Sequence, residues 1–197
     1  SPLTDADGQV IGGIELFTDI SHQAANELRI IELERLALLD GLTQLANRTY
    51  VEREIHGKFE EMKRFDQPFG CLFMDIDHFK SVNDRFGHDV GDDVLKFVAR
   101  TLVANARPFD VYGRWGGEEF VGIIRCIGEK DMERLGNRLR SLIETSYVMH
   151  KGQRISVTMS IGATLFRKTD SSESLVKRAD ELLYRSKREG RNRLTLG

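Results

Sequence analysis

The apolar run at residues 68–77, PFGCLFMDID, sets the strongest limit on how this chain folds. Proline and glycine lie near its start and acidic residues end it, which is typical of a β-strand. A strand that is apolar at nearly every position is buried on both faces, so other elements must cover both sides of its sheet. We therefore expect a central β-sheet with helices packed on it.

The periodicity of the remaining apolar residues predicts those helices and the other strands. Helices are expected at residues 21–39, 47–64, 91–105, 129–144 and 172–189. Besides the strand at 68–77, we expect a hairpin at 110–126, a strand at 154–165 and an edge strand at 192–196. This order indicates a mixed α/β fold whose central sheet contains at least one antiparallel hairpin.

Several residues mark the ends of these elements. Asn47 can cap the helix that follows it, and Gly190 stops the last helix. Gly116 and Gly117, at the tip of the hairpin, favour a type I′ turn with positive φ at both positions. Two glycines also leave the tip bare, so that a phosphate or ribose can approach the backbone, although a tight hairpin accounts for them without any ligand.

The first 39 residues differ from the rest. Residues 1–20 contain a turn at Asp7-Gly8 and a β-rich run at 10–17, too little for a stable unit, so they are interpreted as the end of a preceding domain. The helix at 21–39 then leads to a domain at 40–197. It either pairs with a second copy or docks on its own domain, because two heptads are too few to decide. The missing initial Met suggests a fragment. The sequence that would precede it is a candidate location for a sensor or a membrane segment.

Charge and composition exclude some functions. With 29 basic and 31 acidic residues the net charge is −2, which gives no general reason to expect a nucleic-acid partner. No stretch reaches 18 uninterrupted apolar residues, so no membrane span is predicted in this fragment. Cys71 and Cys126 both lie in apolar runs and are expected to be reduced core thiols without the spacing of a zinc site.

Two pairs of acidic residues lie at strand ends. Asp75 and Asp77 end the buried strand, and because side chains alternate they share one face while Ile76 takes the other. Glu118 and Glu119 follow the glycine pair of the hairpin. Carboxylates brought together in this way suit Mg²⁺, which prefers hard oxygen ligands and substrate phosphates. Acids at a strand end also occur without any ligand.

Polar and basic residues elsewhere are candidates for binding a nucleotide. Asn83 and Asp92 can each hydrogen-bond a guanine edge, and Asp92 is alternatively a simple first-turn acid of a helix. Lys187 and Arg191 flank the end of the last helix. They are either cations that stabilise the helix C-terminus or ligands of a triphosphate, and composition does not decide between the two.

Five segments, in order, resemble GGDEF-type diguanylate cyclases: DGLTQLANR, DIDHFKSVNDRFGHDVGDDVL, RWGGEEF, VTMSIG and ADELLYRSKREGRN. The resemblance covers roughly residues 38–195, with the signature in its GGEEF form. Residues 1–20 resemble the last strand and exit of a PAS-type sensor domain. The resemblance implies a palm-like fold, related to nucleotide cyclases, with a mixed central sheet flanked by helices and preceded by a connecting helix.

The family resemblance also implies a reaction. Two GTP molecules are joined into cyclic di-GMP with release of two pyrophosphates, in a homodimer whose subunits face each other and bind one GTP each. Mg²⁺, or Mn²⁺ in its place, is the implied cofactor, and a bacterial cytoplasmic location is expected. The alternatives are a module that binds GTP or cyclic di-GMP without turnover, and a dimerisation or scaffold domain.

Roles follow for individual residues. The resemblance assigns the metal to Asp75, Glu118 and the Ile76 carbonyl, with Asp77 as a weaker candidate. Glu119 is the further acid needed for turnover, either as a base or as an electrostatic and structural element. The implied substrate ligands are Asn83 and Asp92 for guanine, the backbone of Phe79, Lys80, Gly116 and Gly117, and the side chains of Lys187 and Arg191 for phosphates.

The segment RPFD, five residues before the glycine pair, matches the product-inhibition motif R-x-x-D of the family. The resemblance implies that Arg107 and Asp110 bind cyclic di-GMP, and that Arg138 adds a contact from a neighbouring subunit. An arginine at a helix end and an aspartate in a turn are the alternative interpretation.

Overall fold

The computed structural model describes residues 2–13, 29, 33, 37–65 and 67–197. The chain divides into two compact units, Ser1–Ala37 and Leu38–Gly197. In the first, strands β1 (Pro2–Thr4) and β2 (Val10–Gly13) pair antiparallel. Gly8 has a φ of 81°, which confirms the predicted turn. The part of the β-rich run after residue 13, and most of the helix expected at 21–39, lie outside the described residues.

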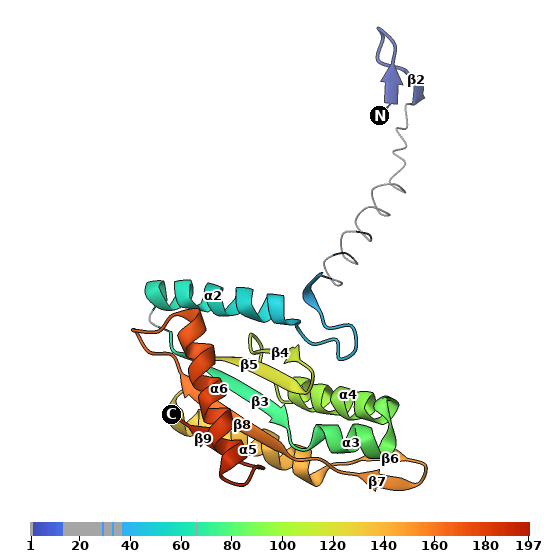
Figure 1. Cartoon of the computed structure of the whole chain (residues 1–197). Helices are drawn as coiled ribbons and strands as arrows, with labels where there is room; N and C mark the ends of the chain where they lie inside the picture. The colour runs from blue at the N-terminus through green and yellow to red at the C-terminus, as the bar shows by residue number, and fades with distance from the viewer. Residues whose placement is uncertain (1, 14–28, 30–32, 34–36, 66) are drawn as a thin grey trace. The chain divides into compact units, whose positions relative to one another are not determined.

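The second unit is built on a five-stranded sheet with the strand order β4-β5-β3-β8-β9 (Figure 1). The central β3 pairs antiparallel with β5 and β8, and β9 pairs in parallel with β8. All eight residues of β3 are buried, as its apolar run predicts. The strands are β3 (Phe69–Ile76), β4 (Val111–Gly116), β5 (Glu119–Arg125), β8 (Met159–Leu165) and β9 (Leu194–Leu196).

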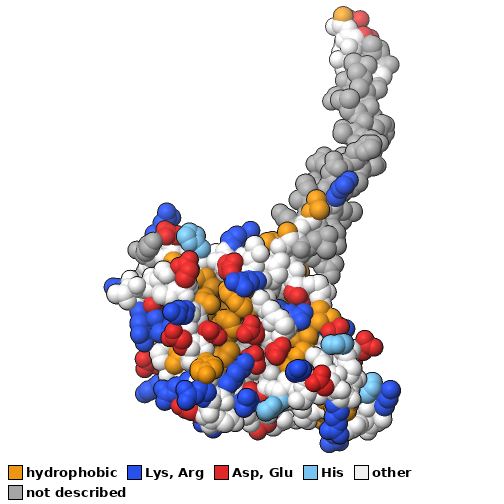
Figure 2. Space-filling model, viewed as in Figure 1, with side chains coloured by type: hydrophobic (Ala, Val, Ile, Leu, Met, Phe, Trp, Pro, Cys, Tyr) orange, Lys and Arg blue, Asp and Glu red, His pale blue; other side chains and the backbone are white. Residues whose placement is uncertain are grey.

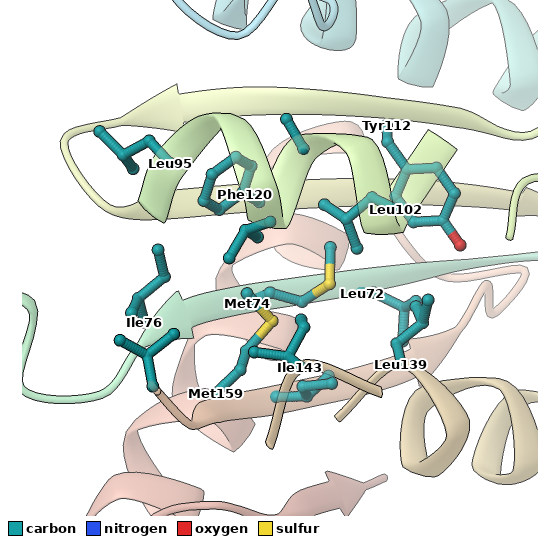
Figure 3. Close-up of a cluster of buried hydrophobic side chains, with 14 of the residues drawn as sticks. Leu72, Met74, Ile76, Leu95, Leu102, Tyr112, Phe120, Leu139, Ile143 and Met159 are labelled. Carbon is teal, nitrogen blue, oxygen red and sulfur yellow. The ribbon is translucent and has the colours of Figure 1, made fainter. Parts of the chain in front are cut away.

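Helices cover both faces of this sheet. Alternate residues of β3 enter two separate cores, because side chains along a strand point to opposite faces. Leu72, Met74 and Ile76 pack with α4 and α5 (Figure 3), whereas Cys71 and Phe73 pack with α2 and α6. The four helices are α2 (Arg48–Phe65), α4 (His88–Ala104), α5 (Glu129–Thr145) and α6 (Ser172–Arg188).

The mixed α/β fold with its antiparallel hairpin is confirmed, and the caps behave as expected. The Asn47 side chain accepts a hydrogen bond from the Tyr50 N–H at 3.0 Å, at the start of α2. Within the described residues, the helices lack the length and apolar character needed to cross a membrane.

Three details differ from the sequence-based expectation. A short helix, α3 (Phe79–Phe86), precedes α4, which begins at His88 instead of 91. The strand expected at 154–165 is interrupted, so β7 (Gln153–Ile155) leaves the sheet and pairs with β6 (Val148–His150). The apolar alternation runs through the interruption and gives no sign of it. Cys126 is exposed, because β5 ends one residue before it, and only Cys71 is a core thiol.

Helix α6 packs directly on β8 at Gly162. A Cβ atom there would overlap the backbone of α6 at Ala179 and Leu183, so only glycine permits this close approach. Gly162→Ala is therefore expected to push α6 away and to lower the free energy of unfolding by about 1–3 kcal/mol. Denaturant unfolding would measure it. The matched control is Gly57→Ala in α2, where a Cβ meets nothing within 4 Å and stability should rise instead.

Candidate active site

The end of β3 brings the two predicted acid pairs together. Asp75 is the cross-strand partner of Glu119 in the β3–β5 ladder. Glu118 lies in the adjacent turn, and its carbonyl accepts a hydrogen bond from the Ile76 N–H at 3.3 Å. Ile76 belongs to the core on the other face, as strand alternation predicts. Carboxylates more than 40 positions apart in the sequence thus meet where the central strand β3 ends.

A cation from α6 reaches this cluster. Lys187 Nζ lies 2.7 Å from Asp75 Oδ2, and the two side chains are 32% and 8% exposed. Arg191, which follows α6, is exposed and adopts a left-handed backbone with a φ of 61°. The structure therefore places Lys187 directly at the acids and Arg191 one turn beyond the helix end.

Burial and neighbouring acids raise the pKa values of Asp75 and Glu119. Burial raises the pKa of Asp75; Lys187 opposes the shift, and Glu118 and Asp77 add to it. Burial and the neighbouring Asp75 likewise raise the pKa of Glu119, against the effect of Lys187. Because like charges disfavour ionisation, the cluster has an excess of negative charge that a divalent cation would relieve.

These donors fit Mg²⁺. The described residues hold no group of three or more His, Cys, Asp or Glu side chains arranged for a metal. Mg²⁺ needs only one or two carboxylates when waters and substrate phosphates complete its shell. Asp75 and Glu118 are two such carboxylates at the end of β3, and the Ile76 carbonyl is a further hard oxygen donor.

Asp77 has a different environment. Its carboxylate accepts hydrogen bonds from Thr158 Oγ1 and Ser160 Oγ, both at 2.7 Å, and from the Asn192 N–H at 3.0 Å. These bonds tie the end of β3 to β8 and to the loop after α6. The weaker metal candidate is thus engaged in structural hydrogen bonds.

The hairpin tip differs from the predicted type I′ turn. Gly116 pairs with Glu119, so Gly117 and Glu118 form the turn, and of the two glycines only Gly117 has a positive φ, 46°. The prediction was wrong because a register shift between Arg114 and Gly116 moves the turn along by one residue. The tip is nevertheless bare, since a Cβ on either glycine would meet nothing within 4 Å.

Two residues that brace this turn were missed from the sequence. The Arg114 Nε–H donates to the Gly117 carbonyl at 2.9 Å, and its Nη1 lies 3.3 Å from Asp40 Oδ1. Asp40 also accepts hydrogen bonds from the Thr43 N–H at 2.8 Å and from Thr43 Oγ1 at 2.7 Å. The segment DGLTQ therefore holds the GGEEF turn through Arg114. The only sequence signal was the position of each residue in a family motif.

This brace predicts a pH-dependent stability. Burial opposes ionisation of Asp40, but hydrogen bonds from Thr43 and the Arg114 guanidinium prevail and lower its pKa. A lowered pKa stabilises the fold above the unfolded-state value and loses that contribution as the pH falls. Asp40→Asn should therefore cost about 1 kcal/mol at neutral pH. The difference from wild type should shrink below about pH 4, measured by urea unfolding; a constant difference would refute the assignment.

The guanine candidates lie next to each other on α3 and α4. A Cβ on Gly91 would overlap the Asn83 side-chain oxygen, so the Asn83 amide lies against α4 at the residue that precedes Asp92. Because α4 begins at His88, Asp92 is its fifth residue, and the alternative interpretation as a first-turn acid is wrong. Phe79 and Lys80 begin α3 directly after the acidic strand end, where backbone N–H groups are available to an anion.

The RPFD segment forms a turn between α4 and β4, beside a cavity of 330 Å³. The Asp110 carboxylate accepts hydrogen bonds from the N–H groups of Arg107, at 2.9 Å, and Arg125, at 3.3 Å. The Arg107 side chain is exposed, and Phe109 is 75% exposed. Arg138 contacts the Asn105 carbonyl at 3.5 Å and does not line this cavity.

Comparison with known proteins places these features in a family. Residues 37–193 match the family described as "Diguanylate cyclase, GGDEF domain". The response regulator PleD of Caulobacter vibrioides is 40% identical over 160 residues, which is 80% of this chain and 35% of PleD. The diguanylate cyclase DosC of Escherichia coli is 36% identical over 159 residues, again 80% of this chain and 35% of DosC. The chain thus spans about a third of the length of these curated relatives.

A solved structure agrees with the fold. The coiled coil and GGDEF domain of DgcB from Caulobacter crescentus, in complex with c-di-GMP, matches with a TM-score of 0.84 and 31% identity. The match covers 90% of this chain and 95% of that one. Since the family match also extends over well more than half of the sequence, the chain belongs to the GGDEF domain family.

Proposed function

We propose that this chain is a diguanylate cyclase, which condenses two GTP molecules into cyclic di-GMP and releases two pyrophosphates. The observation that carries the proposal is the meeting of Asp75, Glu118 and Glu119 at the end of the central strand β3, with Lys187 2.7 Å from Asp75. The family described as diguanylate cyclase and the c-di-GMP complex of DgcB support the same conclusion.

In each half-reaction a ribose 3′-hydroxyl of one GTP attacks the α-phosphorus of the other. A new phosphodiester bond forms between the 3′-oxygen and the α-phosphorus. The bond from the α-phosphorus to the oxygen that bridges to the β-phosphorus breaks, and pyrophosphate leaves. Phosphoryl transfer of this kind depends on positioning and charge neutralisation more than on covalent catalysis. The acid cluster and its cations are suited to that task.

We assign the metal to Asp75, Glu118 and the Ile76 carbonyl. Mg²⁺, or Mn²⁺ in its place, would neutralise the phosphate charge when bound. Glu119 has a raised pKa, so it holds a proton more readily than an ordinary glutamate and is suited to exchange one with the 3′-hydroxyl. The pH profile of a Glu119→Gln variant distinguishes two roles of Glu119, that of the base and that of a charge alone.

The remaining substrate contacts follow from the same geometry. Asn83 and Asp92 would hydrogen-bond guanine at the α3–α4 junction. The backbone of Phe79 and Lys80 and the bare tip at Gly116-Gly117 would bind the phosphates, together with the side chains of Lys187 and Arg191. Lys187 would then leave Asp75 for the nucleotide when the metal binds.

Catalysis requires two subunits, because each GTP needs the 3′-hydroxyl of the other. We infer a homodimer that is promoted by pairing of the helix expected at residues 21–39, with residues 1–20 as the remnant of a PAS-type sensor and 40–197 as the catalytic domain. The rate of product formation should then rise more than linearly with protein concentration. A strictly linear response at low concentration would contradict the dimer requirement.

The RPFD turn is assigned to feedback inhibition. Its exposed Arg107 beside a cavity, with Asp110 fixed by two backbone N–H groups, is suited to clamp a guanine or phosphate of cyclic di-GMP. Arg138 would contribute from a neighbouring subunit.

The function is tested by incubating the protein with GTP and Mg²⁺ and following pyrophosphate release. Pyrophosphate release by the wild-type protein that is no faster than release by an Asp75→Asn control would refute the proposal. Cyclic di-GMP binding without any release would instead favour the non-catalytic binding module.

A further inference from the structure

A second cavity, of 790 Å³, lies between α2 and α6. Its volume is within the range of small-molecule sites, about 300–1,000 Å³. Figure 2 shows apolar side chains exposed below α2, with both acidic and basic side chains around them. None of the nucleotide contacts assigned above, except Glu119, lines this cavity. Its shape and chemistry therefore require their own explanation.

Four elements supply the apolar lining of the cavity. Ile55 comes from α2, Phe73 from β3, Trp115 from β4 and Val176 from α6. The Phe73 and Trp115 rings meet edge to face, with centroids 5.8 Å apart. Since no single element forms this surface, the fold itself builds it, and it suits the apolar body of a ligand.

The basic residues of the lining already have acidic neighbours. Arg48 Nε lies 2.9 Å from Glu52 Oε1, and its guanidinium also stacks on Trp115. Lys177 Nζ lies 3.9 Å from Glu181 Oε1.

His56 is close to Glu173, whose pKa is lowered mainly by hydrogen bonding with Ser171 and in smaller part by His56.

Two acids of the lining have no direct partner in the part of the chain that the structure describes, although Lys187, which does not line the cavity, acts on Glu119 through its charge. Among the described residues, the carboxylates of Glu119 and Asp180 have no side-chain hydrogen bond or ion pair. Asp180 adds to the raised pKa of Glu119, so the two charges act on each other within the cavity. Acids without a direct partner beside an apolar surface are complementary to a cation carried on an apolar body.

We propose that the cavity between α2 and α6 binds a small organic cation, an ammonium or guanidinium group on an apolar body. The charged group pairs with Glu119 and Asp180, and the body covers Ile55, Trp115 and Val176. This binding requires neither GTP nor a metal, and so goes beyond the nucleotide chemistry proposed above.

Trp115 makes the inference testable, because it is the only tryptophan of the chain. Phenethylammonium and the neutral phenethyl alcohol would be titrated against its fluorescence, without GTP or metal. The ammonium is expected to bind at least about tenfold more tightly, the effect of one favourable ion pair. Asp180→Asn should remove much of that preference and leave the alcohol unaffected. Asp131→Asn, an exposed acid on α5 outside the cavity, is the matched control.

Equal affinity for ammonium and alcohol, or an unchanged preference in Asp180→Asn, would overturn the inference. So would the absence of saturable binding by both fluorescence and calorimetry. Val176→Phe narrows the cavity at its apolar wall and should weaken binding of both probes; unchanged binding of both would place them elsewhere. A protein that makes cyclic di-GMP but ignores the probes refutes only this inference, whereas one that binds the ammonium without turning over GTP refutes only the proposed function.

Discussion

Asp75→Asn should abolish cyclic di-GMP synthesis while leaving the protein as stable as wild type or more so. Asp75 is a proposed metal ligand, and losing a charged ligand worth several kcal/mol of transition-state stabilisation lowers the rate by about a thousandfold or more. The change should appear in kcat at saturating GTP and Mg²⁺. The Asp131→Asn variant, which removes an exposed carboxylate and its ion pair with Arg134 away from the acid cluster, should keep the wild-type rate.

The expected stability of Asp75→Asn follows from the sign of its pKa shift. A carboxyl whose pKa is raised by burial and by neighbouring acids disfavours the fold once the pH rises through its unfolded-state value. Asparagine removes that cost at neutral pH, and Lys187, a third exposed, remains hydrated. An inactive variant whose thermal midpoint falls by many degrees would mean that Asp75 supports the fold instead of the chemistry.

Arg107→Ala should relieve the product inhibition that we propose for the RPFD turn. A charge-assisted hydrogen bond contributes about 1.5–3 kcal/mol, so the cyclic di-GMP concentration needed for half inhibition should rise about 10- to 100-fold. The initial rate should stay within about twofold of wild type, because Arg107 lies outside the acid cluster. Initial rates at increasing product concentrations would measure both quantities.

The control for this variant is Arg64→Ala, an exposed arginine on α2 outside the RPFD turn. Cyclic di-GMP should inhibit this variant at the same concentration as it inhibits wild type. Unchanged inhibition in Arg107→Ala would remove the assignment of the turn, whereas a large loss of initial rate would show that Arg107 acts in the catalytic step.

The parts of the fold that depend on strong local patterns were predictable. The continuous apolar run of β3 implied burial on both faces, and strand alternation correctly separated Asp75 from Ile76. The short α3 was missed although Phe79, Val82 and Phe86 follow helical spacing, because a segment of eight residues is too short for that periodicity to stand out. Cys126 was misplaced because one residue at the end of a strand decides between core and surface.

The site was predictable only as a set of residue types. The sequence placed Asp75 and Glu118 at element ends, but their meeting depends on the register of β3 against β5, which no local pattern encodes. The brace between Asp40 and Arg114 joins positions 74 residues apart and has no periodic signal. The engagement of Asp77 with Thr158, Ser160 and Asn192 likewise depends on the tertiary packing.

The most direct test of the proposed function is a chromatogram of the products formed from GTP and Mg²⁺ by the dimeric protein. A diguanylate cyclase converts two GTP into one cyclic di-GMP and two pyrophosphates, and the cyclic product should be absent with Asp75→Asn. Wild-type protein that is folded, dimeric and bound to GTP, yet forms no cyclic dinucleotide, would contradict the central claim.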